Sequence, residues 1–111
     1  MPMLNLKCTK EIPAELLPEL SGLIAGGIGK PEQYVMVVAE KATIMMAGIE
    51  GDAAFAEVKS LGGLNAAVNR SISENLCELL HMKLDIPPER IYINFESLER
   101  DHWGWNGSTF S

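Results

Sequence analysis

The strongest constraint on the fold is an internal repeat. Residues 31–37 (PEQYVMV) and residues 88–94 (PERIYIN) each begin with Pro-Glu, and each follows a stretch whose apolar residues recur at helical spacing. Two such junctions predict two βαβ units in tandem. Because crossovers between parallel strands are right-handed, both helices are expected on one face of a four-stranded sheet. The alternative is a chance similarity between two helix–proline–strand junctions.

The predicted elements follow this plan along the chain. Short apolar or alternating runs predict strands at residues 3–8, 34–39, 56–61 and 91–96. Apolar residues at helical spacing predict helices that end near residues 28 and 84. Gly29 is expected just past the first helix, and Pro87-Pro88 stops the second. We therefore expect a single α/β domain over residues 1–111 (α+β by some schemes), with repeat halves at about 1–50 and 55–111.

The face of the sheet opposite the helices is expected to have a partner. The predicted strands are apolar at nearly every position, for example at residues 34–39. An apolar sheet face without cover marks an interaction surface. Other copies of the same chain are the simplest partner.

The last ten residues predict a β-hairpin. Asn106-Gly107 lies between aromatic and β-branched residues, which is the strongest short-range hairpin signal. Two interpretations stay open for this aromatic segment: a hairpin that closes the core, or one wall of a ligand pocket.

Composition and charge exclude several classes of protein. The chain has 47% hydrophobic residues and a net charge of −6, with no block of Lys or Arg, which disfavours nucleic-acid binding and anionic membranes. No apolar run approaches a membrane-spanning length, and no signal peptide is recognisable. Cys8 and Cys77 are expected to be reduced. The cytoplasm is the default location, and export without a signal peptide stays open.

Ordinary catalytic motifs are absent, which leaves the chain start as the candidate site. No metal, nucleotide or serine-hydrolase motif is present, and His81 and His102 have no obvious partners. If Met1 is removed, Pro2 becomes a chain-terminal secondary amine. Burial near a cation would lower the pKa of that amine and make it a base near neutral pH. If Met1 is retained, the nitrogen is an amide and cannot act as a base.

Five segments resemble a known family when they are taken in order. They are Met1-Pro2-Met3, residues 29–34 (GKPEQY), residues 69–71 (NRS), residues 90–94 (RIYIN) and residues 104–110 (GWNGSTF). Together they resemble the macrophage migration inhibitory factor family of the tautomerase superfamily. The resemblance implies a homotrimer with sites between adjacent subunits. It also implies keto–enol tautomerisation of aromatic α-keto acids such as phenylpyruvate, and of dopachrome-type substrates, with no cofactor and no metal.

The resemblance also implies roles for individual residues. Pro2 is the catalytic base, Lys30 pairs with the substrate carboxylate, and Leu61 offers its backbone N–H. Tyr92 and Asn94 reach the pocket from the neighbouring subunit. Tyr34, Trp105 and Phe110 form the aromatic walls of the pocket.

Each of these positions also has a structural interpretation. Lys30 is alternatively a solvated loop residue, and the aromatic residues are alternatively part of the core. Asn94 lies in an otherwise apolar strand and needs a hydrogen-bonding reason.

The sequence departs from the mammalian members of the family at two places. Residues 53–56 hold no thiol where those members have Cys-x-x-Cys, so the thiol-oxidoreductase activity ascribed to that motif is expected to be absent. Trp103 replaces a small aliphatic residue and is expected at the pocket mouth, where a second indole would narrow the opening or add a stacking surface.

Two other functions stay open besides that of an enzyme. One is a cytokine-like signalling or host-modulating protein that acts through receptors. The other is a trimer that binds its ligand without turnover.

Overall fold

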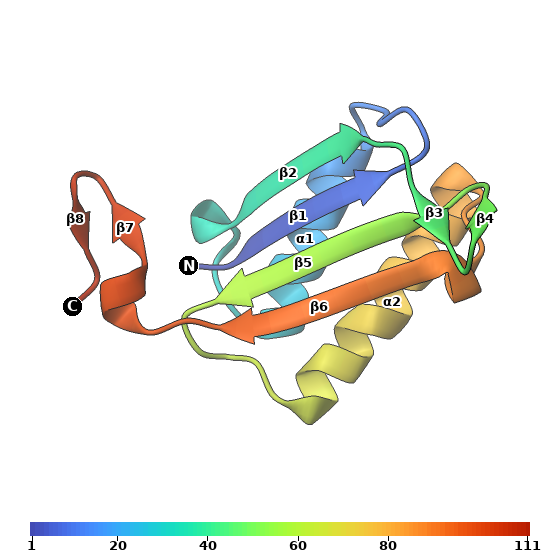
Figure 1. Ribbon diagram of the computed structural model, residues 1–111. Coiled ribbons are helices and arrows are strands. Elements are labelled where there is room, and N and C mark those ends of the chain that lie inside the picture. Colours follow the sequence, from blue (N-terminus) through green and yellow to red (C-terminus); the bar gives the residue numbers. More distant parts are fainter.

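The computed structural model describes residues 1–111 and shows a four-stranded sheet with both long helices on one face (Figure 1). The first βαβ unit contains β1 (Met3–Cys8), α1 (Leu16–Ile28), the single 3-10 turn η1 (Glu32–Tyr34) and β2 (Met36–Lys41). The second contains β5 (Ala54–Ser60), α2 (Ala66–Leu84), η2 (Pro88–Arg90) and β6 (Ile91–Ser97). Two tandem βαβ units are therefore confirmed, in an α+β arrangement.

The pairing of the strands joins the two units into one sheet of order β2-β1-β5-β6. Each unit pairs its own strands in parallel, β1 with β2 and β5 with β6. The central pair, β1 with β5, is antiparallel, with Met3 opposite Lys59. The sheet is thus mixed, and the start of β1 lies at the same end as the ends of β5 and β6.

The core lies between the sheet and the helices. Alternate residues of β1 and β5, such as Leu4 and Val58, are fully buried under apolar side chains of the helices. This alternation is the period-2 pattern of a strand with one covered face. The buried helix residues recur at intervals of four, as a helical stripe requires: Leu16, Leu20, Ile24 and Ile28 on α1, and Ile72, Leu76, Leu80 and Leu84 on α2.

The junctions of the repeat differ from the predicted strand boundaries. The strand predicted at residues 34–39 begins at Met36, because residues 32–34 form the turn η1. In this turn the Tyr34 N–H donates to the Pro31 carbonyl at 3.1 Å. The equivalent turn η2 carries the Arg90 N–H to Pro87 carbonyl bond of 2.9 Å. An extended proline, Pro31 or Pro87, precedes each turn, and η2 has a further proline, Pro88, at its first position, where the fixed φ suits a helical turn.

Two short hairpins complete the fold. The predicted hairpin at Asn106-Gly107 is confirmed as β7 (Gly104–Trp105) and β8 (Ser108–Thr109), with φ of 51° and 82° in its turn. It is preceded by the 3-10 turn η3 (Arg100–His102). A further hairpin, β3 (Met45–Met46) with β4 (Ile49–Glu50), lies at the opposite end of the sheet (Figure 1). This hairpin was not predicted, because its turn residues Ala47-Gly48 lack the Asn-Gly signal.

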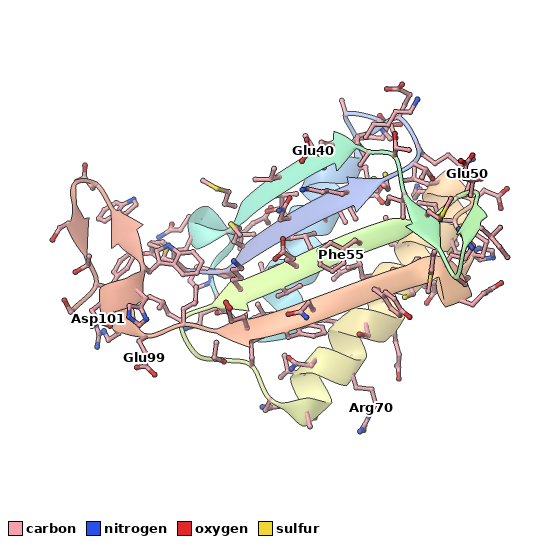
Figure 2. All side chains as sticks on the ribbon, in the orientation of Figure 1. Glu40, Glu50, Phe55, Arg70, Glu99 and Asp101 are labelled. Atoms are coloured by element: carbon pink, nitrogen blue, oxygen red, sulfur yellow. The ribbon has the colours of Figure 1, made fainter.

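The prediction of an apolar open face is wrong for most of the sheet. β1 and β5 alternate, and their outward positions hold polar residues such as Asn5 and Glu57, which are hydrogen-bonded at 3.2 Å. Apolar side chains remain exposed on this face at Met36, Val38, Phe55 and Tyr92. Phe55 points away from the helices in Figure 2. The open face is therefore a mixed polar and apolar surface.

Cys8 and Cys77 are free thiols, and burial raises the pKa of both. Neither helix is long and apolar enough to cross a membrane.

The packing of α1 leads to a stability prediction. Leu20→Ala is expected to lower the free energy of unfolding by about 2–5 kcal/mol, because the fully buried side chain leaves a cavity. Leu17→Ala on the same helix, where the side chain is 40% exposed, is expected to cost under about 1 kcal/mol. Urea denaturation followed by circular dichroism measures both variants. Equal losses would contradict the assignment of the buried face.

Candidate active site

A cavity lies at the end of the sheet where the chain starts. Its volume is about 820 Å³, within the range of small-molecule sites. Four segments distant in sequence line it: Met1, the residues after α1, the residues after β5 and the segment from Leu98 to Phe110. The sheet topology explains this gathering, because the start of β1 is adjacent to the start of β2 and to the end of β5.

The amino-terminal residues are fixed by the sheet. The Pro2 side chain is fully buried, and the Pro2 carbonyl accepts a hydrogen bond of 3.1 Å from the Met36 N–H. Met1 is half-buried and lines the cavity. Burial and, secondarily, the positive charge of Lys30 lower the pKa of the chain-terminal amine on Met1. The chain start therefore lies in surroundings that favour an unprotonated amine.

Lys30 is held at the cavity by the end of α1. Gly29 ends that helix in the left-handed region, with φ of 81°, and the Lys30 N–H donates to the Ala25 carbonyl at 3.1 Å. The Lys30 Nζ donates to the Leu61 carbonyl at 3.2 Å and has no carboxylate within ion-pair distance. An ammonium group has three N–H donors, so two remain for an anion in the cavity.

The loop after β5 is shaped by its glycines. Gly63 has φ of 82°, and a Cβ on it would lie 2.7 Å from the Ile28 Cγ2, so a side chain does not fit. Ser60 is fully buried, and its Oγ donates to the Gly62 carbonyl at 2.7 Å. The N–H of Leu61 donates to no acceptor within the chain. The loop thus leaves the backbone donor of Leu61, a lining residue, free beside Lys30.

Aromatic side chains form another part of the wall. The rings of Trp105 and Phe110 are stacked, with centroids 6.1 Å apart and planes inclined by 14°. Phe110 is fixed by two hydrogen bonds with Arg100: its N–H donates to the Arg100 carbonyl at 3.1 Å, and its carbonyl accepts from the Arg100 Nε at 3.0 Å. Tyr34, on η1, is 46% exposed and lines the same cavity.

The single chain brings together most of the residues that the sequence singled out. The cavity is lined by Lys30, Tyr34, Leu61, Trp105 and Phe110. Pro2 is buried and is not itself a lining residue, although Met1, which precedes it, is. Trp103 is half-buried and is not one of the lining residues, so its place at the mouth stays a prediction.

Two predicted residues lie on the open face of the sheet. Tyr92 and Asn94 are exposed on β6, two positions apart and therefore on one face of the strand, outside this cavity. Their contribution from a neighbouring subunit stays a prediction.

Sequence analysis missed the segment that follows β6. Leu98, Glu99 and Arg100 line the cavity, as does Pro31. No motif marks these residues. The signal that could have found them is topological: parallel β5 and β6 end at the same edge, so the residue after each strand lies near the other.

The chain offers no ready metal site. No three His, Cys, Asp or Glu side chains lie close enough together to hold a metal ion.

Comparisons with known proteins agree with this architecture. The family model described as macrophage migration inhibitory factor (MIF) matches residues 1–111. Macrophage migration inhibitory factor of Meriones unguiculatus is 40% identical over 101 residues, covering 90% of this chain and 88% of that protein. The Xenopus tropicalis protein of the same name is 36% identical over 105 residues, covering 94% and 91%.

A solved structure shows the same fold. The homologue of macrophage migration inhibitory factor from Prochlorococcus marinus superimposes with a TM-score of 0.92 at 37% identity, covering 98% of this chain and 99% of that one. With this fold, this cavity and a family match over its whole length, the chain belongs to the macrophage migration inhibitory factor family.

Proposed function

We propose that residues 1–111 form one tautomerase domain that interconverts the keto and enol forms of aromatic α-keto acids such as phenylpyruvate, and that also accepts dopachrome-type substrates. Pro2, exposed as the chain terminus when Met1 is removed, is the catalytic base. No cofactor takes part.

One observation carries the proposal. The amine of Met1 lies at a cavity that also holds Lys30, which has no carboxylate partner, and burial together with the charge of Lys30 lowers the pKa of that amine. The Pro2 nitrogen, one residue further along the chain, is expected to be under the same two influences once Met1 is removed. An amine that is unprotonated near neutral pH can abstract a proton next to a carbonyl.

The proposed reaction is a proton transfer in two steps. The Pro2 nitrogen takes a proton from the carbon next to the ketone, and the electron pair of the broken C–H bond forms the enolate. The protonated amine then gives the proton to the enolate oxygen, which restores the base and releases the enol. Lys30 pairs with the substrate carboxylate, and the free Leu61 N–H donates to the substrate. The walls made by Tyr34, Trp105 and Phe110 exclude water, which strengthens both electrostatic contacts.

The proposed active form is a homotrimer. The open sheet face carries exposed apolar residues, among them Met36 and Phe55, and it presents Tyr92 and Asn94 outside the cavity of their own chain. The Asn5 Oδ1 on the same face is buried without a partner, which indicates that the face is incomplete in the single chain. Packing against a second copy would bring Tyr92 and Asn94 to the cavity of that neighbour.

The mass of the intact chain separates this proposal from the alternatives. Retention of Met1 would leave the Pro2 nitrogen as an amide. In that case the signalling role or ligand binding without turnover would remain, because neither needs a free amine.

Replacement of Pro2 tests its role as the catalytic base. Pro2→Gly is expected to lower kcat for phenylpyruvate tautomerisation by at least about tenfold, because a flexible primary amine replaces the fixed secondary amine. The rate is measured by ultraviolet absorbance of the enol on protein of verified N-terminal mass.

The control for this variant is its oligomeric state, which must equal that of the parent protein if only the base is changed. Light scattering is expected to give three times the 12.1 kDa of one chain for both the variant and the parent protein. Equal rates for the two proteins would refute the role of Pro2. Insertion of an alanine between Met1 and Pro2, which makes the proline nitrogen an amide, is expected to abolish activity.

A second prediction concerns substrate binding. Lys30→Ala is expected to raise KM for phenylpyruvate about tenfold, because the carboxylate loses its ion pair. The methyl ester of phenylpyruvate, which has no charge, serves as the comparison substrate. Lys83→Ala on α2, which removes a lysine outside the cavity, is expected to change neither KM value. An equal loss for the acid and the ester would exclude the carboxylate role.

A third prediction concerns pH. The base acts only when unprotonated, so kcat/KM is expected to rise with pH through the pKa of the amine and then level off. Burial and Lys30 lower the pKa of the amine on Met1, and we expect both to lower the pKa of the Pro2 amine as well, so the rise is expected below the range of an exposed terminal amine. In Lys30→Ala the rise moves to higher pH, since one cause of the lowered pKa is gone. Profiles from about pH 5 to about pH 10 test both points; a rise in the ordinary range of an exposed amine would contradict them.

A further inference from the structure

The segment after β6 brings a second cation to the candidate active site. Arg100 lines the same cavity as Lys30 but comes from a different part of the chain, the 3-10 turn η3. None of the roles proposed above uses it. A small monocarboxylic substrate needs only one cation, so the presence of two requires an explanation.

Arg100 is positioned by the aromatic wall. Its Nε donates to the Phe110 carbonyl at 3.0 Å, and its own carbonyl accepts from the Phe110 N–H at 3.1 Å. These two bonds hold the arginine against the hairpin whose Trp105 and Phe110 rings are stacked. An arginine with Nε engaged still has the four N–H donors of its two terminal nitrogens. That end of the guanidinium can bind a carboxylate with two hydrogen bonds.

The guanidinium has no anionic partner of its own. The ion pairs of the chain involve Lys7, Lys10, Lys41, Lys83 and His102, and none involves Arg100 or Lys30. In a chain of net charge −6, two unpaired cations therefore line one cavity. The single acidic residue of the lining is Glu99, which leaves an excess of positive charge where a substrate would bind.

We propose that Arg100 binds a second carboxylate at the end of the substrate remote from the α-keto acid. The preferred substrates are then dicarboxylic α-keto acids, with an apolar or aromatic spacer against the stacked rings and one carboxylate for each cation. This inference rests on the proposed tautomerase function and specifies its substrate class. Glu99 lines the same cavity, and its negative charge repels the second carboxylate. It therefore reduces the preference for dicarboxylic over monocarboxylic substrates.

The experiment compares two substrates on the assembled protein. The probes are phenylpyruvate and 4-carboxyphenylpyruvate, which differ only in the distal carboxylate. The measured quantity is the ratio of kcat/KM for the dicarboxylate to kcat/KM for phenylpyruvate. Arg100→Ala is expected to lower this ratio about tenfold, through KM, because a charge-assisted contact is lost. Arg100→Lys keeps the charge and is expected to retain most of the ratio.

Two further variants control for charge and for structure. Glu99→Gln is expected to raise the ratio, since it removes the opposing charge. Arg70→Ala is the matched control, because Arg70 is an exposed arginine on α2, well away from Glu99 and Asp101 in Figure 2. It is expected to leave the ratio unchanged. A purely structural role of Arg100 in the hairpin would lower both kcat/KM values equally and leave the ratio constant, which would overturn the inference.

A binding measurement separates this inference from the proposed function. Trp105 lies in the cavity wall, so quenching of tryptophan fluorescence reports occupancy by either probe. If the parent protein binds 4-carboxyphenylpyruvate more tightly than phenylpyruvate in an Arg100-dependent way but converts neither, the tautomerase proposal fails and the role of Arg100 stands. If the protein converts phenylpyruvate with dependence on Pro2 but Arg100→Ala leaves the ratio unchanged, the role of Arg100 is wrong.

Discussion

The antiparallel pairing of β1 with β5 is the interaction on which the rest of the structure depends. Each βαβ unit can form its own parallel pair, but only this central pairing joins the two units into one sheet. The register of Met3 opposite Lys59 also places the chain start beside the end of β5. A slip by one residue would turn Leu4 and Leu6 to the open face, so burial of the core fixes the geometry of the cavity.

Charge is distributed so that the candidate active site differs from the rest of the molecule. The chain is acidic overall, and four of its lysines form ion pairs with acidic side chains elsewhere on the surface. Lys30 instead contacts a backbone carbonyl and keeps its charge available. The cavity thus offers an anionic ligand a cation that no acidic side chain of the chain neutralises. The same cation favours the neutral form of the nearby amine.

The sequence predicted the elements better than it predicted their surfaces. The apolar stripes of α1 and α2 and the Asn106-Gly107 turn have strong local signals, and they form as expected. The open face was misjudged because β2 is apolar along its first four residues, whereas β1 and β5 alternate. The family resemblance led to the cavity residues from Lys30 to Phe110. Arg100 escaped notice because its place depends on how β5 and β6 end together, which no local pattern reports.

The close approach of Gly63 to Ile28 has a consequence for how the substrate range of such a cavity could change. Gly63 comes directly after the lining residues Leu61 and Gly62, and a side chain on it would displace either Ile28 at the end of α1 or the loop that carries Leu61. The lining residues Leu98 and Glu99, by contrast, are half-buried and exposed, so their replacement disturbs no core packing. The cavity can therefore acquire new ligand contacts by substitution at Leu98 and Glu99, whereas a change at Gly63 would alter the backbone beside Leu61.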